Sequence, residues 1–359
     1  MSEEPLKVLI VDDSRIFRGG IEEALSGRED IRVVGSVWNG EKAIEFARTS
    51  LPDFVTLDIE MPGIGGIATL RTLRELAKAQ QRPIGVLLIS SHTQRGTAVT
   101  VEGLQEGAFD FISKPDSPDA RANADSLQQQ LYAKLDAFRS RRHVSHSVQR
   151  MTTASASSAA VVRRKTNRFR AIVIAASTGG PEALAKLLPT LTPVCPVPIF
   201  LVQHIPASFT PYFASSLEKR CGTKVIPASE GCIAEPGVVY VAGGGHHLVL
   251  KTNRGQIVTG FSDTPPENGC RPAADVLFRS AADVYSEQVL AVVLTGMGSD
   301  GAKGAAVLKR AGAYVVVQDE ATSVVWGMPG SAVAAQAADE ILPLEEIGPA
   351  LVALLGIGV

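Results

Sequence analysis

The stretch Ala171-Ile-Val-Ile-Ala-Ala-Ser-Thr-Gly-Gly-Pro181 combines the two signals that decide the fold. Its apolar residues are typical of a strand that is buried on both faces, as the strands of parallel sheets are. The glycine pair followed by Pro181, a residue favoured in the first turn of a helix, predicts a tight turn into a helix. Ser177 therefore stands where the strand ends, at the edge where open α/β sheets bind their ligands.

Short apolar strands alternate with helical patterns on both sides of this stretch. In the second half of the chain we expect further strands at 197–203, 289–295 and 314–318, and a hairpin that pairs 238–242 with 247–251 across Gly243-Gly-Gly245. In the first half we expect strands at 6–11, 54–57, 84–89 and 109–112, with a helix at 14–25. This alternation predicts an α/β protein made of two doubly wound parallel-sheet domains.

Length and composition are those of an ordinary globular protein with more than one domain. The chain has 359 residues, of which 45% are hydrophobic and 20% charged, whereas a typical domain has about 100 to 200 residues. No stretch approaches the roughly 18 apolar residues of a membrane span, and the acidic N-terminus is unlike a basic secretory signal. We therefore expect a cytoplasmic protein without direct membrane insertion. The cysteines at 195, 221, 232 and 270 form no C-x-x-C pair, which favours reduced thiols over zinc or redox sites.

A basic segment separates two acidic regions and predicts the domain limits. Between Arg139 and Arg168 the chain has eight Lys or Arg and no acid, around the small residues of 152–160. No aromatic residue interleaves these charges, so a solvated linker is favoured over a surface for anionic membrane, and we expect no nucleic-acid partner. Residues 120–142 carry apolar side chains at helical spacing and are expected to lead into the linker as a helix. The predicted parts of the chain are 1–118, 119–168 and 169–359.

Acidic side chains follow two of the first-half strands at the point where each strand ends. Asp12 and Asp13 come after the first strand, and Asp58 comes after a later one. Three carboxylates at one edge repel each other unless a cation lies among them, and oxygen ligands of this kind suit Mg²⁺. Ser90 and Lys114 end two further strands and could hold a phosphoryl group on Asp58 by a hydrogen bond and a positive charge. A helix cap or a solvated loop would explain any one of these residues, but not all five in order.

These residues lie in motifs that resemble those of response-regulator receiver domains. The motifs are Val11-Asp-Asp-Ser14, Leu57-Asp-Ile-Glu-Met-Pro62, Ile89-Ser-Ser91 and Ser113-Lys-Pro115. The resemblance implies a flavodoxin-like fold from residue 6 to about residue 118, and a phosphoryl group that Asp58 accepts from a histidine kinase. It also implies that Ser90, Lys114 and Phe111 sense this group, and that Mg²⁺ is held by Asp12, Asp13, Asp58 and the Glu60 backbone carbonyl. The family usually has Asp-Gly where this chain has Gly65-Gly66, a departure that removes no metal ligand.

Three residues in the second half have the chemistry of a serine hydrolase. Ser177, His204 and Asp300 each follow a predicted apolar strand. A carboxylate beside His204 would fix its tautomer and stabilise the imidazolium that forms when it takes the Ser177 proton. The order Ser, His, Asp and the lack of G-x-S-x-G are not those of an ordinary α/β-hydrolase. A nucleotide phosphate on the turn after Ser177 is the weaker alternative, because neither nucleotide-binding glycine fingerprint is present.

Residues 169–357 resemble the catalytic domain of chemotaxis methylesterases of the CheB family. The motifs that carry the resemblance are Ala176-Ser-Thr-Gly-Gly-Pro181, Gln203-His-Ile-Pro206, Arg271-Pro-Ala-Ala-Asp-Val-Leu-Phe278, Thr295-Gly-Met-Gly-Ser-Asp-Gly301 and Trp326-Gly-Met-Pro-Gly330. A receiver in front of that domain is the same family's architecture, so the resemblance covers nearly the whole chain. It implies a Rossmann-like second domain. The family commonly has His and Ser where this chain has Cys270 and Ala273.

The resemblance implies a phosphorylation-activated hydrolase that removes methyl groups from glutamate γ-methyl esters of chemoreceptors and releases methanol. It also implies deamidation of receptor glutamines, both within chemotaxis adaptation. Ser177 would be the nucleophile, His204 the base and Asp300 its partner. Met297 would serve the oxyanion, and Thr178 would orient Ser177 or the substrate. No cofactor is expected in the catalytic domain, and the unphosphorylated receiver is expected to cover the catalytic cleft.

Three other classes of protein share parts of this pattern. A phosphorylation-controlled DNA-binding regulator should have a basic, helical output domain, whereas residues 169–359 are net acidic and rich in predicted strands. An adaptor that binds receptors through an inactive hydrolase fold has the same residues, because a sequence gives no distances; Ser177→Ala separates it from an esterase. A nicotinamide-dependent enzyme would carry a glycine fingerprint that this chain lacks.

Overall fold

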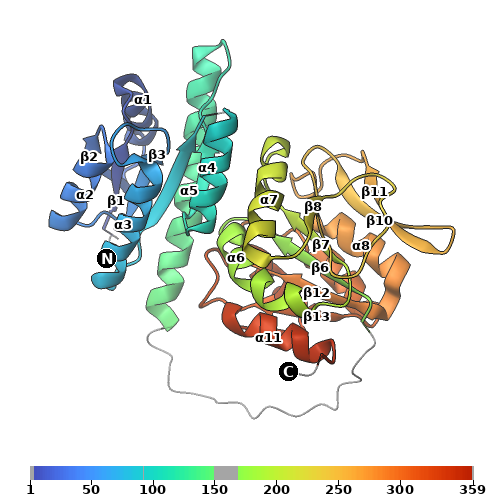
Figure 1. The fold of residues 1–359 in the computed structure, drawn as a ribbon. Coiled ribbons are helices and arrows are strands. Elements are labelled where there is room, and N and C mark those ends of the chain that lie inside the picture. The colour runs from blue at the N-terminus through green and yellow to red at the C-terminus, as the bar shows by residue number, and fades with distance from the viewer. Residues whose placement is uncertain (1–3, 92, 149–168, 358–359) are drawn as a thin grey trace. The chain divides into compact units, whose positions relative to one another are not determined.

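The computed structural model describes residues 4–91, 93–148 and 169–357, which form two compact units (Figure 1). The first unit is Met1–Arg142 and the second is His143–Val359. The serine- and alanine-rich part of the predicted linker, at 149–168, lies outside the described residues. The domain limits drawn from the sequence stay a prediction.

A five-stranded parallel sheet forms the centre of the first unit. Its strand order, β2-β1-β3-β4-β5, is that of flavodoxin-like folds. The strands are β1 (Leu6–Val11), β2 (Ile31–Val37), β3 (Phe54–Asp58), β4 (Gly85–Ser90) and β5 (Asp110–Ser113). The helices are α1 (Arg15–Ser26), α2 (Gly40–Thr49), α3 (Gly65–Ala79), α4 (Gln94–Gln105) and α5 (Ala120–Val148). The strand order reverses between β1 and β3, so the segments that follow these two strands meet at the ligand-binding edge of the sheet.

Helix α5 packs on the first unit, and its apolar side faces that unit's core. The buried Phe138 ring lies 5.2 Å from the ring of Phe54 and 5.5 Å from that of Phe109. Nearer its start, the Lys134 Nζ lies 2.6 Å from Asp110 Oδ2. The helix predicted from the spacing of apolar residues in 120–142 is therefore confirmed. Its regularly spaced apolar side chains pack against the core of the first unit.

A seven-stranded parallel sheet forms the centre of the second unit, in the order β14-β13-β12-β6-β7-β9-β8. Its strands are β6 (Ala171–Ala176), β7 (Ile199–Gln203), β8 (Val225–Pro227), β9 (Val239–Val241), β12 (Val289–Val293), β13 (Tyr314–Gln318) and β14 (Glu340–Leu342). A separate hairpin comprises β10 (His247–Asn253) and β11 (Gln256–Ser262). The helices are α6 (Gly180–Leu191), α7 (Thr210–Cys221), α8 (Ala274–Tyr285), α9 (Ala302–Arg310), α10 (Gly327–Ala334) and α11 (Leu344–Leu354), with 3₁₀ turns η1 (Thr192–Val194), η2 (Ala207–Phe209) and η3 (Ser286–Gln288).

The order of the strands places a switch point in the middle of this sheet. From β6 the chain first adds β7, β8 and β9 on one side, and then returns to add β12, β13 and β14 on the other. The ends of β6, β7 and β12 therefore meet where the direction of winding changes. Open α/β sheets bind their ligands at this point.

The predicted hairpin of 238–242 with 247–251 is wrong. β9 lies in the main sheet between β7 and β8 and is parallel to both, and the Tyr240 ring stacks on Phe200 at 5.4 Å. β10 pairs instead with β11, because Arg254 and Gly255 form a two-residue turn with φ of 49° and 80°. Positive φ at both positions is the backbone of a tight hairpin turn, whereas a run of three glycines specifies no particular turn.

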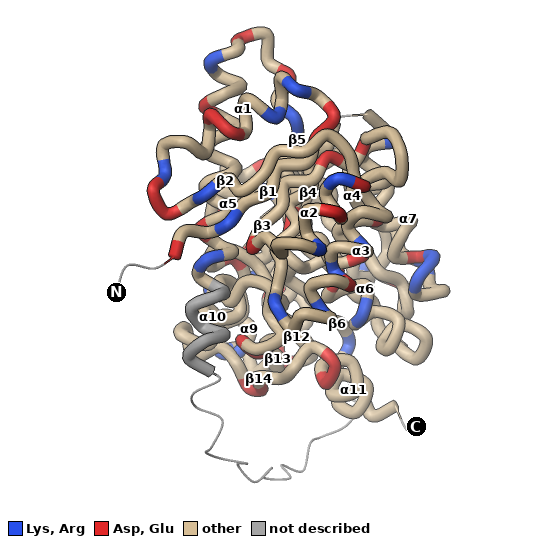
Figure 2. Tube along the Cα trace, turned by 90° about the vertical axis from the view of Figure 1, so that its left-hand side faces the viewer, with Lys and Arg blue, Asp and Glu red and all other residues tan. Residues whose placement is uncertain are grey.

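Charges of both signs are interspersed over the described residues of each unit (Figure 2). Figure 2 shows Lys and Arg alternating with Asp and Glu over both units, in keeping with the formal net charge of −2. Among the described residues, no helix has the length and apolar character needed to cross a bilayer.

Candidate functional site

Three strand ends place the predicted hydrolase residues side by side. β6 and β7 are paired in register through Ala176 and Gln203, so Ser177 and His204 are the next residues on two adjacent strands. The segment after β12 crosses the same edge, where the Ser177 N–H donates to the Thr295 carbonyl at 3.1 Å. The candidate active site therefore lies at the switch point of the second sheet.

Two glycines let the backbone pass close to Ser177. A Cβ at Gly180 would lie 2.1 Å from Gln203 Oε1, and the Gln203 Nε2 donates to the Ser177 carbonyl at 3.0 Å. A Cβ at Gly296 would lie 2.8 Å from the Cβ of Ser177 and 2.2 Å from Met328 Sδ. A side chain at Gly180 would displace Gln203, which bonds the Ser177 carbonyl, and a side chain at Gly296 would press on Ser177 itself. The two glycines therefore help to determine the position of Ser177.

The Asp300 carboxylate holds the His204 imidazole. His204 Nε2 lies 2.8 Å from Asp300 Oδ2, and the two side chains are 14% and 2% exposed. Asp300 also accepts the N–H groups of Ala274 at 2.6 Å, Asp275 at 3.0 Å and Gly301 at 3.0 Å. Because the first two begin α8, the carboxylate sits at the positive end of that helix. Burial raises the pKa of Asp300, but the bonds from His204 and from these N–H groups outweigh burial and hold the pKa below its ordinary value.

The same ion pair controls the protonation of His204. Burial alone would lower the pKa of His204, but the hydrogen bond with Asp300 and the neighbouring Cys270 outweigh burial and raise the pKa to about 9. The other ring nitrogen, Nδ1, lies 3.6 Å from Cys270 Sγ. Since Nε2 faces Asp300, Nδ1 is the nitrogen that could take a proton from Ser177.

Some of the predicted site residues are not joined by hydrogen bonds. Among the described residues, no hydrogen bond connects the Ser177 hydroxyl with His204. In the same part of the chain, the Met297 N–H donates to no backbone carbonyl. The Met297 side chain is 40% exposed, whereas Thr178 is buried and its carbonyl accepts the Thr295 hydroxyl at 3.0 Å. The catalytic roles of these residues stay predictions.

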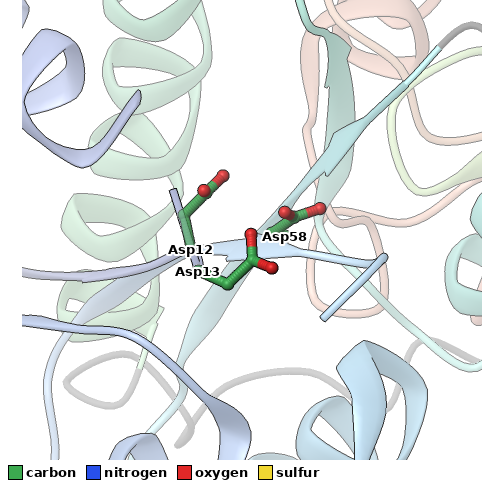
Figure 3. A group of neighbouring side chains, drawn as sticks. All are labelled: Asp12, Asp13 and Asp58. Carbon is green, nitrogen blue, oxygen red and sulfur yellow. The ribbon is translucent and has the colours of Figure 1, made fainter. Parts of the chain in front are cut away.

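The predicted phosphorylation site lies at the carboxyl edge of the first sheet. Asp12 and Asp13 follow β1 and Asp58 ends β3, and one oxygen of each lies within 4.8 Å of the others (Figure 3). Lys114 Nζ lies 2.9 Å from Asp12 Oδ2 and 2.8 Å from Asp58 Oδ2. Burial lowers the pKa of Lys114, but its hydrogen bond with Asp58 and its ion pair with Asp12 outweigh burial and raise the pKa above its ordinary value.

Asp12 has an oxygen that the protein leaves incompletely satisfied. Asp12 Oδ1 accepts the Ser14 N–H at 2.8 Å. Its buried Oδ2 is near Lys114 but receives no hydrogen bond of regular geometry from the described residues. Burial, together with the charge of Asp58, raises the pKa of Asp12 although Lys114 opposes the change. The buried carboxylates of Asp12 and Asp58, together with the exposed Asp13 and the incompletely satisfied Asp12 Oδ2, fit a hard divalent cation. The acidic cluster is therefore compatible with Mg²⁺.

The Ser90 hydroxyl is bonded within the domain core. Ser90 is fully buried, and its Oγ lies 2.6 Å from Thr100 Oγ1 on α4. No hydrogen bond joins Ser90 to Asp58 among the described residues. The Glu60 N–H donates to Asp58 Oδ1 at 3.0 Å, and Phe111 packs against the core while staying partly exposed.

Comparisons with known proteins agree with the kinds of site found in the two units. The family model described as CheB methylesterase matches residues 172–351, and that of the response regulator receiver domain matches residues 8–124. The chain belongs to the CheB methylesterase family. A protein-glutamate methylesterase/protein-glutamine glutaminase of Nocardioides sp. is 40% identical to it, over 96% of this chain and 94% of that protein. One of Desulfotalea psychrophila is 37% identical, over 97% of this chain and 98% of that protein.

A solved structure covers the second unit. The crystal structure of the Thermotoga maritima CheB methylesterase catalytic domain is 39% identical, with a TM-score of 0.51, and the match covers 52% of this chain and 98% of that one. The two departures from the CheB pattern lie in one segment of this unit. Cys270 is the residue next to His204 Nδ1, and the Ala273 N–H donates to His247 Nδ1 at 3.0 Å.

Two residues of this CheB site were not singled out from the sequence. Gln203 clamps the Ser177 carbonyl, and Asn268 Nδ2 donates to Asp300 Oδ1 at 3.0 Å. The position of Gln203 at a strand end, one residue before His204, was a usable signal. For Asn268 the signal was the Asn-Gly pair, which predicts a tight turn but does not say what its side chain contacts.

Proposed function

We propose that this chain hydrolyses glutamate γ-methyl esters on chemoreceptor proteins, with release of methanol, and deamidates receptor glutamines to glutamate. The observation that carries the proposal is the His204–Asp300 pair, 2.8 Å apart, beside Ser177 at the switch point of the second sheet. Relatives that carry the name protein-glutamate methylesterase/protein-glutamine glutaminase support it over nearly the whole chain.

Ser177 is the nucleophile of the proposed reaction. As its Oγ attacks the ester carbonyl, His204 takes the proton at Nδ1 and Asp300 stabilises the imidazolium through Nε2. The base must be neutral at that moment. Because the pKa of His204 is raised to about 9, kcat/KM is expected to increase as the pH rises toward that value.

Backbone N–H groups are proposed to stabilise the tetrahedral oxyanion. The Met297 N–H is the candidate donor, because it donates to no backbone carbonyl in the described part of the chain and follows Gly296, which packs on Ser177. Thr178 is proposed to orient Ser177 through the adjoining turn. Loss of one such oxyanion donor typically lowers kcat by about 10²- to 10³-fold.

Water completes the proposed cycle. The imidazolium of His204 protonates the leaving methoxide and becomes neutral again, and the glutamyl group remains as an ester of Ser177. His204 then takes a proton from water, which attacks this ester. The imidazolium returns that proton to Ser177 Oγ as the serine leaves, so glutamate is released and both Ser177 and His204 are regenerated. With a glutamine side chain the leaving group is ammonia, and the second half of the cycle is the same.

Phosphorylation of Asp58 by a histidine kinase is proposed to activate the hydrolase. Asp12, Asp13, Asp58 and the Glu60 carbonyl would hold Mg²⁺, which when bound neutralises charge on the phosphoryl group. Lys114 already contacts two of these carboxylates and would pair with a phosphoryl oxygen, while Ser90 would donate a hydrogen bond to it and Phe111 would respond by changing its packing. Relief of receiver coverage of the cleft is the proposed route of activation, in a protein located in the cytoplasm.

Methanol release from methylated receptor membranes tests the proposal. The wild type, Ser177→Ala and Asp58→Asn are compared with Mg²⁺ and with or without a small phosphodonor. Release should be stimulated by the phosphodonor in the wild type, unstimulated in Asp58→Asn and lost in Ser177→Ala. Release that survives Ser177→Ala would overturn the triad, and a Ser177→Ala protein that still supports receptor adaptation would favour the adaptor.

A further inference from the structure

A tight turn lies against both partners of the His204–Asp300 pair. Glu267 and Cys270 exchange backbone hydrogen bonds of 3.1 and 2.9 Å. Between them Asn268 and Gly269 have φ of 53° and 76°, which is the backbone of a two-residue turn with left-handed central residues. Asparagine is one of the few residues with a side chain that adopts this conformation readily.

The left-handed backbone aims the Asn268 carboxamide at two buried carboxylates. Its Nδ2 donates to Asp300 Oδ1 at 3.0 Å and to Asp275 Oδ2 at 2.9 Å. Asp275 and Asp300 are 0% and 2% exposed, whereas Asn268 stands at the surface. A neutral amide is the fitting group here, because it donates to both carboxylates without adding charge.

We propose that Asn268 is a positioning residue of the esterase, which fixes the Asp300 carboxylate against His204. The inference rests on the proposed roles of Ser177, His204 and Asp300, and it deepens them. Asn268 does not touch the reacting atoms. It acts through Asp300, so its loss lowers kcat and alters the pH profile while leaving substrate affinity unchanged.

The turn is tied to the rest of the unit on both sides. The Glu267 carboxylate forms two hydrogen bonds with the Arg279 guanidinium on α8, at 2.9 and 2.5 Å. Beyond the turn, the buried His247 accepts the Ala273 N–H at 3.0 Å and its other nitrogen lies 3.2 Å from the Pro265 carbonyl. The segment that carries Asn268 is therefore held at both ends, as a positioning device requires.

Several titratable groups share this environment and enter any pH profile. Cys270 on the turn faces His204, Asp275 on α8 shares the Asn268 amide, and the Glu267–Arg279 pair lies on the far side. Burial raises the pKa of Asp275 although its hydrogen bonds from Gly304 and Asn268 oppose the change. Variants at Asn268 are therefore compared with one another, and all retain these groups.

Two substitutions separate the carboxamide from the turn. Asn268→Gly keeps a residue that accepts positive φ and removes only the amide. Asn268→Asp keeps the shape and replaces the donor by a third acidic group. The matched control is Arg254→Gly, because Arg254 occupies the same position of the exposed β10–β11 turn, with φ of 49°, followed by Gly255 with φ of 80°.

Methanol release from receptor membranes is measured for the full chain with phosphodonor, as kcat and KM against pH. For Asn268→Gly we expect kcat to fall about tenfold, because one hydrogen bond to a charged group is lost, and KM to stay unchanged. Arg254→Gly should have the kcat and KM of the wild type. For Asn268→Asp the added negative charge raises the pKa of His204 and moves the acidic limb of kcat/KM to higher pH. If Asn268→Gly does not fold, the position of the acidic limb of kcat/KM in Asn268→Asp is the measurement that tests the inference.

Three results would overturn the inference: kcat of Asn268→Gly within about twofold of wild type, an equal loss in Arg254→Gly, or an unmoved limb in Asn268→Asp. Failure of the triad is recognised separately, because Ser177→Ala would then stay active. An inactive Ser177→Ala beside a fully active Asn268→Gly leaves the proposed function standing and removes only the role of Asn268.

Discussion

His204 makes the stability of the second unit depend on pH in a direction that its contacts with Asp300 dictate. The perturbation is His204→Gln, which removes the titrating ring. In the folded chain the pKa of His204 is raised to about 9, against an ordinary value of 6.5. A raised pKa means that the charged form stabilises the fold. This contribution is complete below about pH 6.5 and is lost as the pH rises through about 9.

The size of the effect follows from the two pKa values. The difference between about 9 and 6.5, at 1.36 kcal/mol per pH unit, corresponds to about 3 kcal/mol of unfolding free energy. Little reduction for solvent screening is needed, because the His204 side chain is only 14% exposed. Between about pH 6 and about pH 10 the wild type should therefore lose about 3 kcal/mol that His204→Gln does not lose.

The chain offers a fluorescence assay for this unit. It has two tryptophans, Trp38 in the first unit and Trp326 in the second. Trp38 is 53% exposed, so Trp38→Phe is expected to disturb little and leaves Trp326 as the sole reporter of the second unit. Urea unfolding in this background, with and without His204→Gln, gives the free energies at each pH. Groups shared by the two chains cancel in the comparison.

Parallel pH curves for the two proteins would refute this reasoning, since His204 would then have the same pKa in the folded and unfolded chain. A difference in unfolding free energy that grows as the pH rises would refute it as well. The raised pKa of His204 requires the stability advantage of the wild type over His204→Gln to shrink as the pH rises. Either result would mean that Asp300 does not raise the pKa of His204 in the folded chain.

Three further predictions concern single contacts. Gly296→Ala places a Cβ 2.8 Å from the Cβ of Ser177, so kcat for methanol release should fall about a hundredfold, as misplaced reacting groups do; an active, folded variant would contradict this. Thr100→Val removes the hydroxyl that donates to Ser90 Oγ at 2.6 Å and so frees the Ser90 side chain to turn from the Ser91 carbonyl toward the phosphoryl group. The phosphodonor concentration for half-maximal stimulation should fall about threefold, as loss of one modest hydrogen bond would produce; an unchanged titration would count against it. Asp13→Asn should weaken Mg²⁺ binding about tenfold in calorimetric titration, because it removes a charged ligand, and unchanged affinity would place the ion elsewhere.

Strand ends were the part of the structure that sequence predicted best. The strands at 6–11, 171–176 and 314–318 have the predicted bounds, because each is an apolar run buried in a parallel sheet. β7 begins at Ile199 rather than at 197, since Pro198 has no N–H for the ladder. β2 was not predicted, because this edge strand is mostly half-buried and lacks a continuous apolar run.

Contacts between segments distant in the chain were the part that could not be predicted. The wrong hairpin arose because Val239–Val241 and His247–Asn253 both have strand composition, and only packing assigns them to different sheets. The Asn-Gly turn at 268–269 was visible as a turn, but its target, Asp300, lies 32 residues away in sequence. The Thr100–Ser90 contact had no local signal.

The proposed function requires that one acyl-Ser177 intermediate serves both the ester and the amide reaction. It is tested most directly by running full-length wild type in hydroxylamine, with receptors that carry either methyl ester or glutamine at the modified site, and measuring glutamyl hydroxamate against glutamate by peptide mass spectrometry. The account predicts the same ratio from both substrates, because the intermediate that partitions is the same, and no enzyme-dependent hydroxamate from Ser177→Ala. Different ratios from the two substrates, or hydroxamate formed by Ser177→Ala, would contradict it.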